Sequence, residues 1–347
     1  MQKRLLWILA LVFCLGTQAQ RKISMYAVGF YNQENLFDTC HDAGKNDYDF
    51  TPNGSYRWNG MKYTHKLRNM ARALADMGTD KLPGVGCAAI GMAEVENDRV
   101  LADLVSQEPL SKRGYRYVHV EGPDKRGIDC ALLYNPQLFR VNGVKLHPYV
   151  QSLAKDSAFK TRGFLTVDGE MAGERLTIIV CHWPSRFSTS FYREQGGRQV
   201  RALKDSLMKA DPKLKVLVMG DMNDDPTDKS MTEALGCKAD IDQVKDGEMY
   251  NPWYNILAKQ GVGTLFYHGS WNLFDQIVMS RNLLNQNGRK DFSTLKFFAN
   301  QIFRRDYLIQ KEGKYKGAPL RTTAGGVWLD GFSDHLPVVT YFVKEKK

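Results

Sequence analysis

Short apolar runs rich in β-branched and aromatic residues recur along the whole 347-residue chain, and they constrain its fold more than any other feature. Two stretches with helical spacing lie between them. The first is 64–77, with Thr64 as its expected N-cap, and the second is 193–210, whose glycine pair argues against a helix start before about residue 197. Strands and helices mixed over the whole length predict one α/β or α+β domain. The strand-like runs are 23–32, 86–93, 128–134, 175–182, 215–220, 275–280 and 335–343.

Acidic, amide or imidazole side chains stand at one end of nearly every one of these runs. The run KVLVM at 215–219 leads into GDMNDDP, which places Asp221 and Asn223 directly after the strand. Taken singly, such a sequence is a turn signal, because Asp and Asn close turns. Taken together, the strand ends are typical of a binding or catalytic site, since functional side chains gather where strands meet loops. The other strand ends supply Asn35, Asp38, Glu94, Glu96, His182, Arg186, Asp275, Asp334 and His335.

This combination of side chains suits the hydrolysis of a phosphate ester. Carboxylate oxygens hold a hard cation such as Mg²⁺, with water and substrate phosphate completing its coordination. Histidine transfers protons near neutral pH, and a carboxylate behind it sets the tautomer. Asparagine donates to a phosphate oxygen without adding negative charge.

The chain resembles the endonuclease/exonuclease/phosphatase superfamily, which has the DNase I-like fold. The resemblance covers about residues 25–343 and implies an α+β fold, a four-layered αββα sandwich of two mixed sheets with outer helices and a site at one edge. The strand at 215–219 would then be buried on both faces. The segments that carry the resemblance, in order, are YNQENLFD, GMAEVEND, DKRGIDCALLY, CHWPSR, MGDMNDDP, NLFDQIVMS and GFSDHLPV.

The resemblance also implies roles for the residues on the metal side of the site. Glu94 and Asn35 would hold the metal, and Asp334 would be a second carboxylate on that side. Glu96 matches less well than Glu94, because the family's glutamate directly follows its strand. The expected metal is Mg²⁺, with Mn²⁺ or Ca²⁺ as alternatives.

On the catalytic side, Asp221 and Asn223 would position the attacking water and the phosphate. His335 would be the catalytic histidine, oriented by Asp275. His182 would be the second histidine, and its expected partner is Asp129.

Two arginines are expected to contact the substrate. Arg126 lies in the segment DKRGID, which could serve the phosphate through this side chain instead of serving His182 through Asp129. Arg186 follows His182 closely enough to be near the site. Arg193, Arg198 and Arg201 are expected on a solvated helix face. The basic, aromatic segment 301–322 is either a nucleic-acid contact beside the site or a peripheral hairpin.

The first residues have the order of a secretory signal: Lys3 and Arg4, then an apolar stretch, then small and polar residues. We expect cleavage after Ala19, which leaves a single catalytic domain at 20–347 in the periplasm or outside the cell. A lipoprotein anchor at Cys14 is disfavoured by the large residue before it, and stable membrane insertion is not expected. The formal charge is +10, and loss of Lys3 and Arg4 leaves +8.

The sequence therefore predicts an exported, divalent-metal-dependent phosphodiester hydrolase, and a non-specific nuclease above other activities. A basic surface attracts polyanions, although a solvated basic surface needs no partner. In the predicted reaction His335 takes a proton from water and His182 protonates the leaving oxygen, with the assignment of base and acid left open. The alternatives are a phosphatase or phosphodiesterase for inositol phosphates or sphingomyelin, and a binding protein without turnover. The oligomeric state is left open.

Overall fold

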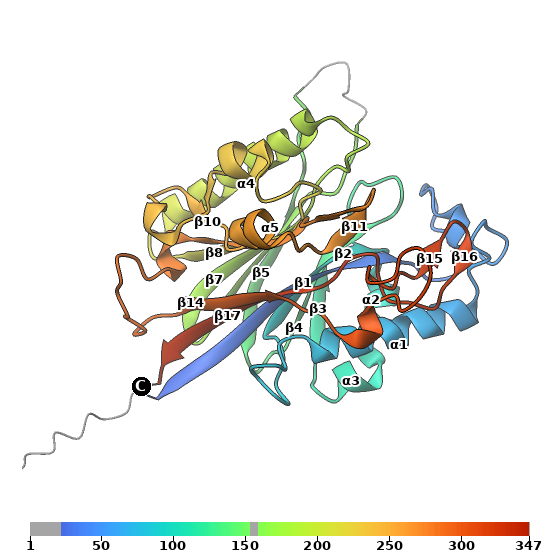
Figure 1. Cartoon of the computed structure of the whole chain (residues 1–347), viewed down its shortest axis with the longest axis horizontal. Coiled ribbons are helices and arrows are strands. Elements are labelled where there is room, and N and C mark those ends of the chain that lie inside the picture. The colour runs from blue at the N-terminus through green and yellow to red at the C-terminus, as the bar shows by residue number, and fades with distance from the viewer. Residues whose placement is uncertain (1–21, 153–158, 347) are drawn as a thin grey trace, which may run out of the picture.

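Two mixed β-sheets lie face to face, with helices on their outer sides (Figure 1). This computed structural model describes residues 22–152 and 159–346, so the predicted signal segment 1–19 lies outside the described residues. The predicted α+β sandwich is confirmed.

The first sheet has six strands in the order β14-β17-β1-β2-β4-β3. Its central strand β1 pairs antiparallel with β17 and parallel with β2. Three helices cover the outer face: α1 (Gly60–Asp76), α2 (Asp98–Ser106) and α3 (Glu108–Ser111). The strands are β1 (Ile23–Leu36), β2 (Ala89–Val95), β3 (Arg116–His119), β4 (Asp129–Tyr134), β14 (Lys296–Ile302) and β17 (Val338–Glu345).

The second sheet has seven strands in the order β5-β6-β7-β8-β13-β10-β9. The long helix α4 (Ser190–Ala210) and the π-helical turn η3 (Ser230–Ala234) cover its outer face (Figure 1). The strands are β5 (Phe139–His147), β6 (Phe164–Met171), β7 (Glu174–His182), β8 (Lys215–Asp221), β9 (Cys237–Lys238), β10 (Met249–Tyr250) and β13 (Asp275–Ser280).

Short elements complete the described fold at its edges. They are α5 (Tyr254–Gln260), the hairpins β11 (Leu265–Tyr267) with β12 (Ser270–Asn272) and β15 (Thr323–Ala324) with β16 (Val327–Trp328), and the 3-10 turns η1 (Tyr48–Phe50), η4 (Ile241–Gln243), η5 (Arg281–Leu283) and η6 (Asp306–Leu308).

Three hydrophobic layers separate the four structural layers. Alternate side chains of a strand face opposite sides, so a strand between two layers is apolar throughout. In β8, Leu217 and Met219 enter the core between the sheets, whereas Val216 and Val218 enter the core beneath α4. All residues of β8 are buried, which confirms the expectation for KVLVM. Full burial of each such side chain contributes roughly 1.5–3 kcal/mol.

Both predicted helices form, but each begins earlier than expected. Helix α1 begins at Gly60, and its N-cap is Asn59, whose side chain accepts a hydrogen bond from the Lys62 backbone; the expected cap at Thr64 is wrong. Helix α4 begins at Ser190 and runs through its glycine pair. A Cβ on Gly197 would lie 2.6 Å from the Ser230 carbonyl oxygen, so the glycine permits close packing against η3, and this contact outweighs its poor helix propensity. Within the described part of the chain, no helix is both long and apolar enough to cross a bilayer.

The cysteines of the described residues are all free. Cys87, Cys130 and Cys181 are buried, one in each of the three hydrophobic layers. These three pack as small core residues, whereas Cys40 is exposed.

Candidate active site

Three neighbouring strands of the second sheet bring polar side chains to one edge of the sandwich. Asp221 at the end of β8 is in register with His182 at the end of β7 and with Asp275 at the start of β13. Because β8 runs parallel to β7 and antiparallel to β13, the end of two strands meets the start of the third. Glu94 comes from the facing sheet, and its Oε1 lies 3.8 Å from His182 Nε2.

His335 is held by a buried carboxylate, as predicted. Its Nδ1 lies 2.7 Å from Asp275 Oδ2, and its Nε2 lies 3.8 Å from Asp221 Oδ2. Burial alone lowers the pKa of His335, but Asp275 and Asp221 outweigh it and raise that pKa well above its usual value. His335 is therefore a cationic imidazolium at neutral pH, oriented by Asp275.

His182 lies on the other side of the Asp221 carboxylate, and it is neutral where His335 is cationic. Its Nε2 is 3.7 Å from Asp221 Oδ2. Burial, together with the cations Arg162 and Arg126, lowers the pKa of His182 well below its usual value. Among the described residues, His182 Nδ1 has no hydrogen-bond partner. His182 is therefore neutral, and its Nε2 faces the carboxylates.

The expected pairing of Asp129 with His182 is not formed. Asp129 Oδ2 instead lies 3.3 Å from His119 Nε2 and accepts a hydrogen bond from the Gly122 backbone at 3.1 Å. Asp129 begins β4 and His119 ends the adjacent strand β3, so the pair forms within the first sheet. His119 carries no motif in the sequence that would have indicated this pairing.

Asp221 is anchored by two amides, one of which the sequence reasoning missed. Its Oδ2 accepts a hydrogen bond from Asn32 Nδ2 at 3.0 Å, and its Oδ1 accepts one from the Asn223 backbone at 2.9 Å. Burial raises the pKa of Asp221 to about 6, although His335 lowers it in part. Asn32 is the last residue of the expected strand 23–32, so its place at a strand end was the signal that could have identified it. The Asn223 side chain donates to the Trp183 carbonyl oxygen at 2.9 Å.

Glu94 and Asn35 form the predicted metal-side pair at the bulged ends of β2 and β1. Both have positive φ angles, 62° and 61°, a left-handed backbone conformation that is uncommon for non-glycine residues. The Asn35 backbone donates to Glu94 Oε2 at 3.0 Å. Arg126 Nη2 lies 2.5 Å from Asn35 Oδ1 and 4.0 Å from Glu94 Oε2, so the guanidinium lies beside both of these oxygens. The donor set fits Mg²⁺, which takes few protein oxygens and keeps several waters.

Asp334 lies beside His335 rather than in contact with Glu94. Its Oδ1 is 3.9 Å from His335 Nε2, and its Oδ2 accepts a hydrogen bond from Arg321 at 3.1 Å. Arg321 also donates to Glu34 Oε1 at 3.1 Å. No contact of the described residues joins Asp334 to Glu94 or Asn35, so its predicted place as a metal ligand stays a prediction.

Arg186 is engaged by the turn that follows β8. Its Nη2 lies 3.0 Å from Asp225 Oδ2 and 3.1 Å from Asp228 Oδ2, and its Nε donates to the Asn223 carbonyl oxygen at 3.2 Å. Two carboxylates thus neutralise the guanidinium in this structure, and the expected contact of Arg186 with the substrate stays a prediction. Asp225 lies in the turn that follows β8.

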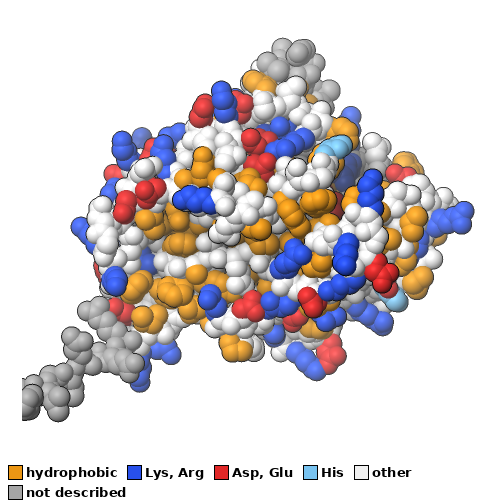
Figure 2. Space-filling model, viewed as in Figure 1, with side chains coloured by type: hydrophobic (Ala, Val, Ile, Leu, Met, Phe, Trp, Pro, Cys, Tyr) orange, Lys and Arg blue, Asp and Glu red, His pale blue; other side chains and the backbone are white. Residues whose placement is uncertain are grey.

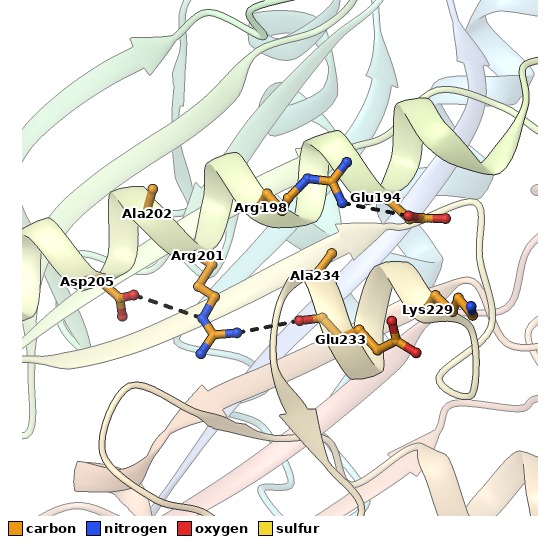
Figure 3. Close-up of a pocket in the computed structure, with 8 residues that line it drawn as sticks. All are labelled: Glu194, Arg198, Arg201, Ala202, Asp205, Lys229, Glu233 and Ala234. Atoms are coloured by element: carbon orange, nitrogen blue, oxygen red, sulfur yellow. Dashed lines mark hydrogen bonds and ion pairs between the residues drawn. The ribbon is translucent and has the colours of Figure 1, made fainter. Parts of the chain in front are cut away.

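The remaining arginines of α4 divide between the interior and the surface. Arg193 is buried and its Nε pairs with Asp224 at 2.7 Å, so its predicted place on a solvated face is wrong. Arg198 and Arg201 line a cavity of about 410 Å³ between α4 and η3 (Figure 3). Arg201 donates to the Glu233 carbonyl oxygen there, at 3.4 Å. The residues that line this cavity include none of the candidate site residues.

The basic segment 301–322 forms a folded-back stretch whose end reaches the site. Gln310 and Ala318 are hydrogen-bonded through their backbones, and Ile309 forms an isolated bridge with Pro319. Arg321, near the end of the segment, contacts Asp334. The segment is thus both a hairpin and a neighbour of the site, whereas the sequence left these as alternatives.

Comparisons with known proteins agree with this geometry. The model of the "Endonuclease/Exonuclease/phosphatase family" matches residues 27–344, and the chain belongs to this family. No curated protein sequence matches the chain.

Solved structures show the same fold at low sequence identity. A Bacteroides thetaiotaomicron protein of this family is 15% identical, with a TM-score of 0.56, and 94% of this chain and 97% of that chain are covered. A mannosyl-6-phosphatase from the same species is 15% identical, with a TM-score of 0.55 and coverage of 91% and 99%. TDP2 from D. rerio, complexed with a single-strand DNA product, is 13% identical, with a TM-score of 0.53 and coverage of 92% and 99%. Family and fold together support a hydrolase of the phosphodiesterase, phosphatase or nuclease type.

Proposed function

We propose that the protein is a divalent-metal-dependent phosphodiester hydrolase that cuts nucleic acid, and that it acts after export to the periplasm or the extracellular space. One observation carries the proposal. The Nε2 atoms of His182 and His335 lie 3.7 and 3.8 Å from the same oxygen of Asp221, on either side of it. A phosphate bound there would meet one cationic imidazolium, one neutral imidazole and a carboxylate.

The charge states suggest a division of roles that differs from the sequence-based one. We assign the general base to Asp221, because its pKa of about 6 makes it ionised yet basic near neutral pH. The imidazolium of His335 donates a hydrogen bond to a phosphate oxygen and offsets the charge that develops there. The neutral His182 donates from Nε2 to a second phosphate oxygen. Mg²⁺ held by Glu94 and Asn35 would supply the charge that stabilises the leaving oxygen.

Positive charge around the site supports nucleic acid as the substrate. Arg126 lies on the metal side with half of its side chain exposed, and the partly exposed Arg321 lies beside Asp334. Several Lys and Arg side chains lie over the region of β15 and β16 (Figure 2). A continuous polyanion gains from such spread charge more than a small phosphate ester does. The exposed basic residues of the folded-back segment are Arg304, Lys311, Lys314, Lys316 and Arg321.

The test is nicking of supercoiled plasmid by the protein with Mg²⁺, with EDTA and as the His335→Ala variant. We expect nicking that requires the metal and is lost in the variant, whereas Asp103→Asn, on helix α2, should nick as the wild type does. Folded protein that leaves plasmid and RNA intact with metal present would overturn the nucleic-acid proposal. Release of phosphate from a sugar phosphate or an inositol phosphate would then assign the same site to a small phosphoester, and cleavage of sphingomyelin would assign it to a lipid.

A further inference from the structure

A second group of carboxylates lies beside the candidate active site and is separate from it. Glu96 is only two residues from Glu94, but it lies with Asp42 and Asp47 and not with His182 and His335. One carboxylate oxygen from each of these three residues lies within 4.8 Å of the others. Asp47 and Glu96 are each only 2% exposed, so two members of this acidic cluster are removed from water.

The acidic cluster holds more negative charge than its neighbours neutralise. The Asp38 backbone donates to Glu96 Oε2 at 2.7 Å, which brings the Asp38 carboxylate to the same place. Of the four carboxylates, Asp38 pairs with Arg99 at 2.9 Å and Asp47 pairs with His41. Buried carboxylates without compensating charge are costly.

Glu96 provides a second, independent sign of a missing ligand. Its Oε1 is buried and has no hydrogen-bond partner among the residues that the structure describes. Buried carboxylate oxygens are nearly always paired, and an unpaired one calls for a specific explanation. The charged groups that act on Glu96 are the carboxylates of Asp38, Asp42 and Asp47, which have the same sign as its own charge.

We infer that Asp42, Asp47 and Glu96 bind a Ca²⁺ ion that is structural rather than catalytic. The donors are all oxygens, which a hard cation prefers. Two oxygens on opposite sides of a Ca²⁺, each at about 2.4 Å, are about 4.8 Å apart, so the three carboxylates fit around one ion. Ca²⁺ accepts six to eight oxygens in a flexible geometry, whereas Mg²⁺ demands a near-ideal octahedron. Water and the second oxygens of the carboxylates would complete the coordination.

The ion would stabilise the loop between β1 and α1, which borders the active site. In this loop Asn46 donates through its backbone to the Lys125 carbonyl oxygen at 2.6 Å, and Lys45 Nζ donates to the Gly122 carbonyl oxygen at 3.1 Å. Both acceptors belong to the segment that carries Arg126. Bound Ca²⁺ would therefore support the position of Arg126 from a distance and make no contact with the phosphate.

Terbium luminescence tests this inference, because Tb³⁺ replaces Ca²⁺ and is excited through nearby aromatic rings. Tyr48 stacks on His41 with ring centroids 4.0 Å apart, which places an antenna beside the acidic cluster. The measurement uses the full chain as Glu94→Gln, which removes the main carboxylate of the catalytic metal site. We expect saturable emission that Ca²⁺ displaces, and an affinity at least tenfold weaker when Glu96→Gln or Asp47→Asn is added.

Thermal unfolding gives the second readout and separates this inference from the proposed function. In the Glu94→Gln protein, Ca²⁺ should raise the melting temperature over EDTA, and adding Asp42→Asn, a partly exposed position that should not impair folding, should abolish the rise. Emission that is absent in Glu94→Gln, or unchanged by the cluster variants, would overturn the inference. Mg²⁺-dependent hydrolysis by the wild type is measured in parallel, because its absence would count against the proposed function and not against the Ca²⁺ site.

Discussion

Replacing Asp275 by Asn tests the assignment of His335 as a buried cation. The change keeps the shape of the side chain and a hydrogen bond to Nδ1, which is 2.7 Å from Asp275 Oδ2, but it removes the negative charge. The pair is buried, with Asp275 fully inaccessible to solvent. Asp275 raises the pKa of His335, so the variant should have a lower pKa at this histidine.

The size of the effect follows from the burial of the pair. Removing one partner of a buried ion pair costs about 3–5 kcal/mol, and each pKa unit corresponds to about 1.4 kcal/mol. Because Asn retains a hydrogen bond, we expect a loss of stability near the lower end of this range and a lower pKa of His335. The turnover number at pH 8 should then fall by about 10²-fold or more, within the range of groups that act in proton transfer and charge stabilisation.

The assay is the pH dependence of kcat/KM on an activated phosphodiester, for the wild type, Asp275→Asn and Asp129→Asn. Activity should fall at alkaline pH as His335 loses its proton, and this limb should move to lower pH in Asp275→Asn. The ratio of wild-type to variant rates should therefore shrink as the pH falls towards 6. Asp129→Asn should leave the limb in place, because Asp129 pairs with His119.

The raised pKa of His335 also determines how the stability of Asp275→Asn relative to the wild type changes with pH. A histidine with a raised pKa stabilises the fold fully below its unfolded pKa of about 6.5, and this contribution is lost as the pH rises through the folded pKa. The deficit of Asp275→Asn in unfolding free energy should thus be largest at low pH and narrow at alkaline pH. An alkaline limb at the same pH in wild type and Asp275→Asn would refute the reasoning.

Three further predictions concern the neighbouring residues. Asp221→Asn should abolish hydrolysis in the presence of Mg²⁺. In EDTA the same variant should raise the unfolding free energy at pH 8 by up to about 3 kcal/mol, because a buried carboxyl with a pKa raised to about 6 costs roughly that much above this pH, a figure in which the attraction to His335 is already counted. Urea unfolding at pH 8 and pH 4 measures this, and a gain at pH 4 equal to that at pH 8 contradicts it. Gly220→Ala should cost about 3 kcal/mol or more in urea unfolding, since its Cβ would lie 2.1 Å from the Cys181 carbonyl oxygen, and a loss below about 1 kcal/mol would contradict the packing. Arg126→Ala should raise KM for DNA about tenfold or more at constant kcat, whereas Arg186→Ala should leave KM unchanged and lower the melting temperature. Steady-state kinetics and thermal unfolding distinguish the two variants, and the reverse pattern would contradict both assignments.

The amino-acid sequence alone was sufficient to predict the strands and the polar side chains at their ends. A buried strand needs an apolar residue at every position, so runs such as 215–219 identify themselves without any knowledge of the fold. The resemblance to the family then placed Asp275 behind His335 correctly. It also favoured Glu94 over Glu96 at the histidine site, and the contacts of Glu94 with His182 agree.

Only the tertiary structure decided which polar groups pair. Asn32 bonds to Asp221 and Arg321 bonds to Asp334 across many intervening residues, and no local pattern encodes such a partner. Asp129 pairs with His119 on the adjacent strand β3, and a motif carried over from a family could not reveal this pair. The physical reason is that hydrophobic burial follows the period of a strand or helix, whereas the partner of a charge depends on which segments packing brings within hydrogen-bond distance.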